Sequence, residues 1–455
     1  MPLIIAGERS GVGKTTITLA LLSWLKNQGK SIQSFKVGPD YIDPMFHTAI
    51  TGLPCRNLDP ILTSEDYIKS CFSYHSQQAD ISIIEGVMGL YDGVPTHTSF
   101  CYGSTAHIAK LLQIPVILII DCSKLSTSIA AIIYGYVNLD LEVRIAGIIL
   151  NKVGSEKHLS LLKEGLKICS IPIVGIWFRE KYIELPSRHL GLIPTEEITL
   201  HKQIFKQLGI LAENSFSWDI LMPYFQEKQN YFTNKLVINS SHFTPQKKYN
   251  IRIAIARDKA FNFYYQDNFD ILESLGVELV FFSPINDDKI PDNIQGIYLG
   301  GGFPEVFASE LAKNITMIKS LKKAINSGIF TYAECGGMMY LSEKIIDFES
   351  KSWEMVGVLP NIAMMDKKLT LGYREGKILI KNKLFKDNII LKGHEFHRGK
   401  NYHDSNSPII EIKDYYTQQI LSYQGWQIQN IYASYLHIHF ANIIPQIKIL
   451  VEAIL

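Results

Sequence analysis

The sequence predicts an α/β protein with two doubly wound domains, each built on a parallel sheet. Short apolar runs recur along the chain without polar alternation, which is typical of strands buried on both faces. Helical patterns lie between these runs, and the alternation is interrupted once by a polar, weakly periodic stretch. The chain has 455 residues, of which 47% are hydrophobic, so it is long enough for two separate cores.

The expected strands fall into two groups on either side of the polar stretch. The first group is Leu3–Ala6, Ile32–Val37, Ile81–Glu85, Val116–Asp121 and Ala146–Asn151, with helices between them such as Thr15–Asn27 and Ser104–Leu112. The second group is Ile251–Ala256, Glu278–Phe282, Ile294–Leu299 and Ile329–Ala333. We therefore predict domains at residues 1–225 and 250–455, joined by a linker at residues 226–249.

The charge balance argues against nucleic-acid and membrane partners, and the cysteine pattern argues against a zinc site or a disulfide framework. With 45 basic and 44 acidic residues, the net charge of +1 provides no global attraction to nucleic acid or to a membrane surface. No apolar run approaches the ~18 residues of a membrane span. The six cysteines include no C-x-x-C pair, so neither a zinc site nor a disulfide framework is expected. A cytoplasmic protein fits these features, and the possibility of a homodimer stays open.

A glycine-rich loop, GERSGVGKTT at residues 7–16, connects the first strand to the first helix. Glycines let backbone amides curl around phosphates, and the N-terminus of the helix adds partial positive charge. Lys14 is expected to reach the terminal phosphates, and the Thr15 hydroxyl is expected to bind Mg²⁺. The nucleotide should also meet Asn151, whose amide offers a donor and an acceptor to a purine. The full predicted ATP site is Gly7, Gly11, Gly13, Lys14, Thr15, Thr16 and Asn151.

Acidic residues follow the strands of the first domain where magnesium and phosphates would bind. Hard cations prefer oxygen ligands, and ligands of such sheets bind at the carboxyl ends of the strands. We expect Thr15, Asp40 and Glu85 to hold Mg²⁺, and Lys36, Asp40 and Asp43 to contact the substrate. Asp121 ends another strand and is equally well explained as a helix cap.

The loop has an unusual spacing that points to a particular group of enzymes. Five residues rather than four separate Gly7 from the Gly-Lys-Thr core, and Glu8 stands at the usual first-glycine position. This loop resembles that of the dethiobiotin synthetase family, whose members activate carboxylates with ATP. It also resembles the partition-type ATPases, because Arg9 stands where they carry a signature lysine. The loop alone does not choose between the two.

A second reactive element lies in the second domain, where Cys335 joins a strand to a helix between small residues. Such a sharp turn exposes a nucleophile, and the helix N-terminus is expected to lower the pKa of the thiol. Backbone amides of Gly301, Gly302 and Gly336 are candidates for an oxyanion hole. Further along, His437 can act as the base. The set predicts covalent catalysis by Cys335 and His437.

This second domain resembles the class I glutamine amidotransferases, which have a flavodoxin-like sheet. The resemblance implies that Cys335 forms a glutamyl thioester with L-glutamine and that His437 activates it. The usual pattern has a glutamate two residues after the histidine, where this chain has His439. That departure is found in the cobyrinate and cobyrate synthase branch. It leaves open whether His439 or a backbone carbonyl orients His437.

The order of the two domains, together with several local stretches, resembles the cobyrinate a,c-diamide synthase family. These stretches are residues 35–43, 56–59, 85–93, 187–192, 300–305, 333–337 and 433–440, which span nearly the whole chain. The resemblance implies a glutamine-hydrolysing carbon–nitrogen ligase of cobalamin biosynthesis. It would use ATP, Mg²⁺ and L-glutamine to amidate the a- and c-carboxylates of a corrin through acyl phosphates.

Several basic and polar residues are expected to bind the carboxylates of that substrate. Arginine pairs with carboxylate through two parallel hydrogen bonds, so Arg56, Arg188 and His189 join Lys36 as candidates. Two alternatives remain. The ring could be hydrogenobyrinate or nickel-sirohydrochlorin instead of cobyrinate. The chain could instead be a partition-type ATPase switch with an inactive amidotransferase domain, for which Arg9 is the support.

Overall fold

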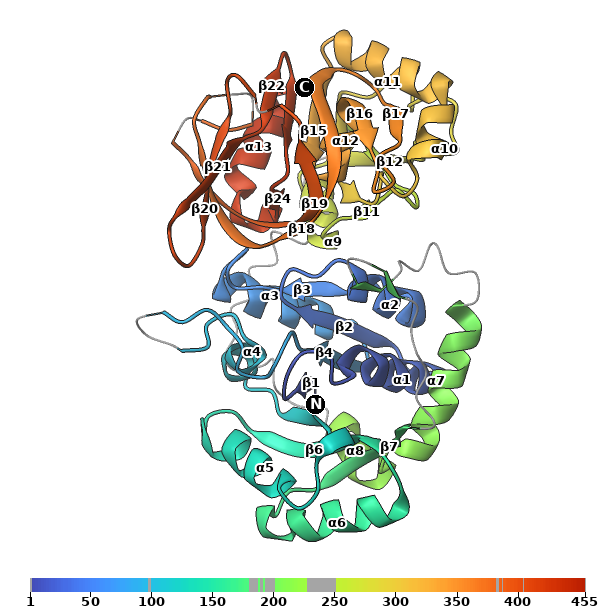
Figure 1. Cartoon of the computed structure of the whole chain (residues 1–455), viewed down its shortest axis with the longest axis vertical. Coiled ribbons are helices and arrows are strands. Elements are labelled where there is room, and N and C mark those ends of the chain that lie inside the picture. The colour runs from blue at the N-terminus through green and yellow to red at the C-terminus, as the bar shows by residue number, and fades with distance from the viewer. Residues whose placement is uncertain are drawn as a thin grey trace. The chain divides into compact units, whose positions relative to one another are not determined.

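The computed structural model describes residues 2–96, 100–179, 187–188, 191–192, 201–226, 251–381, 384–386, 388–403 and 405–454. The chain forms two compact units, of which unit 1 is Met1–Pro60 with Ser64–Asn239, and unit 2 is Ser240–Leu455 with Ile61–Thr63. Within the described ranges, no helix has both the length and the apolar character that crossing a membrane requires. Figure 1 shows both units with their elements labelled.

Unit 1 is built on a seven-stranded sheet in the order β3-β2-β4-β1-β5-β6-β7, and all its neighbouring strands are parallel. The central strands β1 and β5 have every residue buried, because helices cover both faces. The strands are β1 (Leu3–Gly7), β2 (Ile32–Val37), β3 (Arg56–Leu58), β4 (Ile81–Glu85), β5 (Val116–Asp121), β6 (Ile145–Val153) and β7 (Ile173–Phe178).

The helices of unit 1 connect these parallel strands, and α1 packs against both α2 and α7 (Figure 1). They are α1 (Lys14–Asn27), α2 (Ile42–Thr51), α3 (Glu65–Ser76), α4 (Thr105–Leu112), α5 (Ile129–Asn138), α6 (Glu156–Leu166), α7 (His201–Ser215) and α8 (Trp218–Gln226). The short strands β8 (Ser187–Arg188) and β9 (Gly191–Leu192) pair with each other. Since β1 lies between β4 and β5, the loop after β1 opens at the middle of the carboxyl edge of the sheet.

Unit 2 contains a six-stranded sheet in the order β12-β10-β13-β15-β23-β22, in which only the β22–β23 pair is antiparallel. Its strands are β10 (Ile251–Ala256), β12 (Val277–Phe282), β13 (Gly296–Leu299), β15 (Phe330–Glu334), β22 (Trp426–Ile428) and β23 (Ile431–Ser434). The helices are α9 (Gln266–Ser274), α10 (Ala308–Lys313), α11 (Ile315–Asn326), α12 (Gly336–Leu341) and α13 (Ile444–Ala453).

A second, mostly antiparallel sheet in unit 2 was not expected from the sequence. It consists of β16 (Ser342–Ile346), β17 (Ser352–Glu354), β18 (Leu359–Ile378), β19 (Ile390–Asn401), β20 (Ile410–Asp414), β21 (Ile420–Gln424) and β24 (His437–Ile438). A further pair joins β11 (Phe261–Phe263) to β14 (Gly301–Gly302). The second sheet matters for function because β24 carries His437 and pairs with β19, where His394 lies opposite it.

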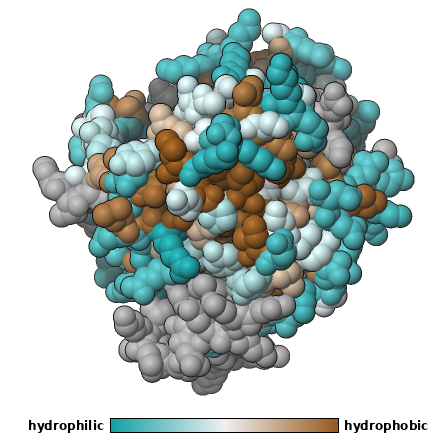
Figure 2. All heavy atoms as spheres, turned by 90° about the horizontal axis from the view of Figure 1, so that it is seen from below, coloured by the Kyte–Doolittle hydropathy of each residue, from teal (hydrophilic) through white to brown (hydrophobic). Residues whose placement is uncertain are grey.

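The structure confirms the predicted α/β class, the parallel sheet of the first half and the renewed sheet of the second. Residues 227–249 of the predicted linker lie outside the described residues, so the domain bounds stay a prediction. Figure 2 views the end of unit 1 where α6 lies and shows apolar side chains gathered there. Exposed apolar residues of α5, α6 and the segments after them are Tyr134, Leu139, Leu141, Leu161 and Ile168.

Candidate active sites

The loop between β1 and α1 has the backbone of a phosphate cradle. Gly11 and Gly13 have φ angles of 75° and 96°, in the left-handed region that glycine reaches at no steric cost. Lys14 Nζ donates hydrogen bonds to the carbonyl oxygens of Arg9, at 3.2 Å, and Met88. Burial, with the nearby charge of Lys36, lowers the pKa of Lys14 to about 8. Lys14 is thus folded over the loop, within reach of a bound phosphate.

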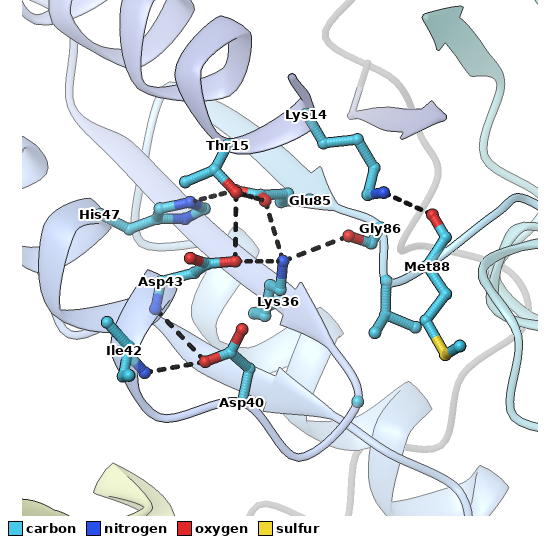
Figure 3. Close-up of polar contacts among 12 residues, drawn as sticks. Lys14, Thr15, Lys36, Asp40, Ile42, Asp43, His47, Glu85, Gly86 and Met88 are labelled. Carbon is cyan, nitrogen blue, oxygen red and sulfur yellow. Dashed lines mark hydrogen bonds and ion pairs between the residues drawn. The ribbon is translucent and has the colours of Figure 1, made fainter. Parts of the chain in front are cut away.

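Behind the loop, a buried lysine is clamped between two carboxylates (Figure 3). Lys36 Nζ lies 2.6 Å from Asp43 Oδ2 and 2.8 Å from Glu85 Oε1. Thr15 Oγ1 donates to the same Glu85 oxygen at 2.7 Å and to Asp43 Oδ2 at 3.2 Å. The hydroxyl predicted to bind magnesium therefore shares two carboxylate oxygens with Lys36.

His47, which the sequence analysis did not single out, completes this cluster from α2. Its Nε2 lies 2.7 Å from Glu85 Oε2, and both side chains are fully buried. Burial opposes a charge on the imidazole, but Cys55 and Glu85 raise the pKa of His47 to about 10. Burial also opposes a charge on Glu85, yet Lys36 and His47 hold the pKa of that carboxyl well below its ordinary value. Glu85 is therefore ionised between two cations.

Asp40, predicted to bind magnesium and substrate, lies at the start of α2 beside this cluster. Its Oδ1 accepts the backbone N–H groups of Ile42, at 2.8 Å, and Asp43, at 3.4 Å, so this oxygen closes the first turn of α2. Asp43, and not Asp40, contacts Thr15 and Lys36. The magnesium set of Thr15, Asp40 and Glu85 stays a prediction, and Asp43 is a further candidate ligand because it shares Thr15 with Glu85. Because Asp40 and Asp43 are close in sequence, the sequence did not show which of the two carboxylates would accept hydrogen bonds from the start of the helix.

The oxygen donors of this cluster suit a divalent cation. Burial and the nearby Asp40 raise the pKa of Asp43 to about 7, although Lys36 opposes this. Burial lowers the pKa of Lys36, but Asp43 and Glu85 outweigh it and raise that pKa. The two carboxylates of Asp43 and Glu85 thus face the two cations Lys36 and His47. A hydroxyl and two carboxylates form a set of hard oxygen donors that suits Mg²⁺.

Two other residues considered for the site, Asn151 and Asp121, form hydrogen bonds or ion pairs with the protein itself. Asn151, expected to read the purine, is buried, and its Nδ2 donates to Val12 O in the phosphate loop at 2.7 Å. Asp121 accepts Ser123 N–H and pairs with Arg9 at 3.1 Å and Lys152 at 2.9 Å. These contacts lower the pKa of Asp121 to about 2 against the effect of burial. The basis for a partition-type switch weakens, since Arg9 has a local partner.

In unit 2, the turn around Cys335 has the geometry expected of a nucleophile. Cys335 follows β15, precedes α12 and has a φ of 47°, which is uncommon for a residue with a β-carbon. Such backbone strain is typical of catalytic positions. The turn is held by the hydrogen bond from Cys335 N–H to Ser434 O at 2.8 Å. The buried thiol therefore sits on a fixed elbow.

The glycines predicted for the oxyanion hole pack against this elbow and against His437. A β-carbon added to Gly301 would lie 2.4 Å from His437 Cε1, and one on Gly336 would lie 3.1 Å from Gly302 N. Gly302 has a φ of 153°, and a β-carbon there would lie 2.1 Å from Ala260 O. Side chains at these positions would collide with their neighbours, so Gly301 lies against His437 and Gly336 lies against Gly302. The catalytic and oxyanion-hole roles stay predictions.

A carboxylate close to His437 belongs to Glu334, the residue directly before Cys335. Glu334 Oε2 lies 3.8 Å from His437 Nδ1, and both side chains are buried. His439 instead faces Asp267, with 3.6 Å between its Nε2 and Asp267 Oδ2, and accepts Ala441 N–H at its Nδ1. The sequence analysis missed Glu334, although a charged residue at the end of a buried strand beside a nucleophile was a visible signal.

The pKa values in the cysteine site differ from expectation. Burial, followed by the charges of Glu305 and Glu334, raises the pKa of the Cys335 thiol, whereas the helix N-terminus was expected to lower it. Desolvation outweighs the few amides of the six-residue α12. Burial also lowers the pKa of His437 to about 3. The resting site thus holds a neutral thiol and a neutral imidazole.

The residues predicted to bind the substrate are only partly covered. Arg56 is buried on β3 of unit 1, which is the strand beside β2 and its Lys36. Arg188 lies on β8, and its side chain is outside the described residues, as is the whole of His189. Their binding roles stay predictions.

Comparison with known proteins agrees with the two-part geometry. Residues 3–193 match the CobQ/CobB/MinD/ParA nucleotide binding domain, and residues 252–443 match the CobB/CobQ-like glutamine amidotransferase domain. The cobyrinate a,c-diamide synthase of Synechococcus sp. is 49% identical over 97% of this chain and 96% of its own length. Those of Synechocystis sp. and Priestia megaterium are 46% and 41% identical, over 98% and 99% of this chain and 92% and 96% of theirs.

A nucleotide-binding unit and a glutamine amidotransferase unit occur here in the order, and over nearly the full length, of these relatives. The chain therefore belongs to the cobyrinate a,c-diamide synthase family.

Proposed function

We propose that this protein uses ATP and glutamine to amidate the a- and c-carboxylates of cobyrinate in cobalamin biosynthesis. The observation that carries the proposal is the presence of two assembled half-sites in one chain whose relatives with this name match it over almost their whole length. One half-site has the groups to activate a carboxylate, and the other has the groups to release ammonia.

In the activating site, the loop amides and Lys14 bind the phosphates of ATP. Thr15, Asp43 and Glu85 would hold Mg²⁺, which neutralises phosphate charge during transfer. Lys36 donates to the carboxylate of the substrate or to the phosphoryl group that it receives. The transfer turns the carboxylate into an acyl phosphate and releases ADP. His47 keeps Glu85 ionised and fixed throughout, because it contacts the carboxylate oxygen that faces away from Lys36.

In the ammonia site, His437 takes the proton of Cys335 as the sulfur attacks the carboxamide carbon of glutamine. The oxyanion of the tetrahedral intermediate is stabilised by backbone amides among Gly301, Gly302 and Gly336. The intermediate expels ammonia, and water then hydrolyses the glutamyl thioester to glutamate. Ammonia displaces phosphate from the acyl phosphate and completes the amide. Because the neutral thiol and imidazole are the resting forms, the proton moves only when glutamine is present.

The test is turnover of cobyrinate with ATP, Mg²⁺ and glutamine, followed by mass spectrometry of the product. A gain of two amide groups, with ATP hydrolysis stimulated by cobyrinate, is expected. Hydrogenobyrinate and nickel-sirohydrochlorin in parallel reactions serve as competing substrates. Faster turnover of either would refute the assignment of the ring, and glutamine-independent ATP hydrolysis alone would refute the synthetase.

We also propose that the protein is cytoplasmic and forms a homodimer. The six cysteines are all free thiols, as is typical of a reducing compartment. For the dimer, the support is the group of exposed apolar side chains at the α5–α6 end of unit 1, with Leu141 82% and Ile168 77% exposed. Light scattering should give twice the mass of the chain, and Leu141→Glu should halve it. A monomeric parent protein would contradict the dimer.

A further inference from the structure

Glu334 stands where the amidotransferase site needs a group to orient its histidine. Resting on the proposed function, we infer that Glu334 is the positioning residue of His437, in place of the carboxylate that this chain lacks two residues after the histidine. In a Cys–His pair, a third group fixes the imidazole so that one nitrogen faces the thiol, and stabilises the imidazolium once it forms. Here that group comes from the strand that ends at the nucleophile.

The geometry supports this role because Glu334 Oε2 is directed at His437 Nδ1. The two atoms lie 3.8 Å apart, which is longer than a hydrogen bond, and both side chains are buried. A small approach therefore brings them into contact, and no solvent competes for the carboxylate. Meanwhile Gly301 packs against Cε1 on the imidazole ring, so the histidine has little freedom to turn.

Three donors hold the Glu334 carboxylate in place. Tyr332 OH and the backbone N–H of Ile438 donate to Oε1 at 2.6 and 3.0 Å, and Tyr298 OH donates to Oε2 at 3.2 Å. Ile438 follows His437 directly, so the same carboxylate holds the backbone of β24 and faces the imidazole beside it. Oε2 accepts one hydrogen bond, from Tyr298, and also lies on the side of His437 Nδ1.

Within the described ranges, β19 contributes further charged and titratable groups that act on His437. His394, His397 and Glu395 all act on the imidazole electrostatically. Arg374 neutralises Glu395, with 2.7 Å between Arg374 Nε and Glu395 Oε2, and thus leaves Glu334 as the carboxylate whose oxygen faces Nδ1 without a cation beside it. The proton that His437 takes from Cys335 then creates an imidazolium–carboxylate pair. When the proton passes to the departing ammonia, His437 becomes neutral again.

The experiment is Glu334→Gln in the full chain, which keeps the shape of the side chain and removes the charge. We expect the glutamine-dependent kcat to fall about 100-fold, with KM for glutamine within about threefold of the parent. Activity with ammonium chloride should stay within about twofold, and Glu334→Asp should recover part of the loss. Alkylation of Cys335 by iodoacetamide should move to higher pH, because the carboxylate no longer stabilises the imidazolium that forms when the neutral thiol passes its proton to His437.

Loss of the ammonia-dependent activity as well, or an unchanged pH profile of alkylation, would overturn the inference. If Glu334→Gln fails to fold, Tyr298→Phe removes one donor from Oε2 and should lower the glutamine-dependent kcat about fivefold; no change in kcat would equally overturn it. Tyr432→Phe is the matched control, because Tyr432 stacks on Tyr332 with ring centroids 5.4 Å apart. Failure of the proposed function is distinct, since the parent enzyme itself would then amidate cobyrinate with neither glutamine nor ammonium chloride.

Discussion

Glu85 in unit 1 and Glu334 in unit 2 are both fully buried carboxylates at the end of a central strand, yet their pKa values move in opposite directions. Lys36 and His47 outweigh the burial of Glu85 and lower its pKa. Around Glu334 the donors are two phenols and one backbone amide, so burial dominates and raises its pKa to about 7. Burial is the same in both places, and the charge of the partners decides the outcome.

This difference matches the chemistry proposed for each site. A phosphate site needs fixed charges to hold a cation and a nucleotide, so it keeps its ions permanently formed. A site that moves a proton within a Cys–His pair instead needs groups that ionise only during the reaction. Substitutions in either site should therefore either separate the two chemistries further or show that the two sites are not independent.

Cys335→Ala should lower the glutamine-dependent activity by about 10³-fold or more, because no other group there can form the thioester. With ammonium chloride the variant should retain the activity of the parent within about twofold, since unit 1 is intact. Steady-state assays with the two nitrogen sources measure this. Equal loss with both sources would show that the two sites do not divide the reaction as proposed.

Asp43→Asn and Asp40→Asn should separate the metal ligand from the helix cap. Asp43→Asn removes one proposed oxygen charge and should lower kcat about 100-fold while raising the Mg²⁺ concentration needed for half-maximal rate. Asp40→Asn should leave kcat and stability nearly unchanged, because the amide oxygen of Asn still accepts the N–H groups at the start of α2. Measuring activity as a function of Mg²⁺ concentration distinguishes the two roles. If the Asp40 variant needs more Mg²⁺ for half-maximal rate than the Asp43 variant, the ligand set predicted from the sequence is correct.

The dependence of stability on pH should have opposite signs for the two carboxylates. Glu334 has a raised pKa, so its folded form binds the proton more tightly, and its contribution is complete below 4.5 and is lost as pH rises to about 7. The loss is on the order of 3 kcal/mol. Glu85 has a lowered pKa, so its contribution is present above 4.5 and is lost as pH falls below that value.

Urea unfolding of the parent, Glu334→Gln and Glu85→Gln between pH 3.5 and 8 measures these contributions. Glu334→Gln should flatten the fall in stability between pH 4.5 and 7, and Glu85→Gln should flatten the fall below pH 4.5. Slopes of the same sign for both residues would contradict the comparison.

Asn151→Ala should produce the smallest effect. Its amide donates to the phosphate loop at Val12 O, and loss of one such hydrogen bond costs about 1 kcal/mol, or about fivefold in ATP affinity. The loss should be equal for ATP and GTP if Asn151 only supports the loop. A selective loss of ATP binding would instead confirm the purine-reading role predicted from the sequence. Calorimetric titration with both nucleotides separates these outcomes.

Much of the fold could be predicted because it depends on local pattern. The buried apolar strands and the glycine loop were recognised from consecutive residues, and the observed bounds of the predicted elements differ from the predicted ones by no more than two residues. The long antiparallel pair β18–β19 was missed, since Leu359–Ile378 mixes exposed and buried positions without a clean alternation. His394, Glu395 and His397 lie on β19 and were therefore missed as well. All three act electrostatically on His437.

The sequence by itself determined the two chemistries. A phosphate loop and a cysteine elbow are each formed by neighbouring residues, so the glycines and small residues that their backbone turns require can be recognised in the sequence. Only the tertiary structure decided which side chains serve them. His47 meets Glu85 from 38 residues away, and Ile438 meets Glu334 from 104 residues away. Such pairs depend on how strands are ordered in the sheets, and their pKa values depend on burial, which is set by packing from the whole unit.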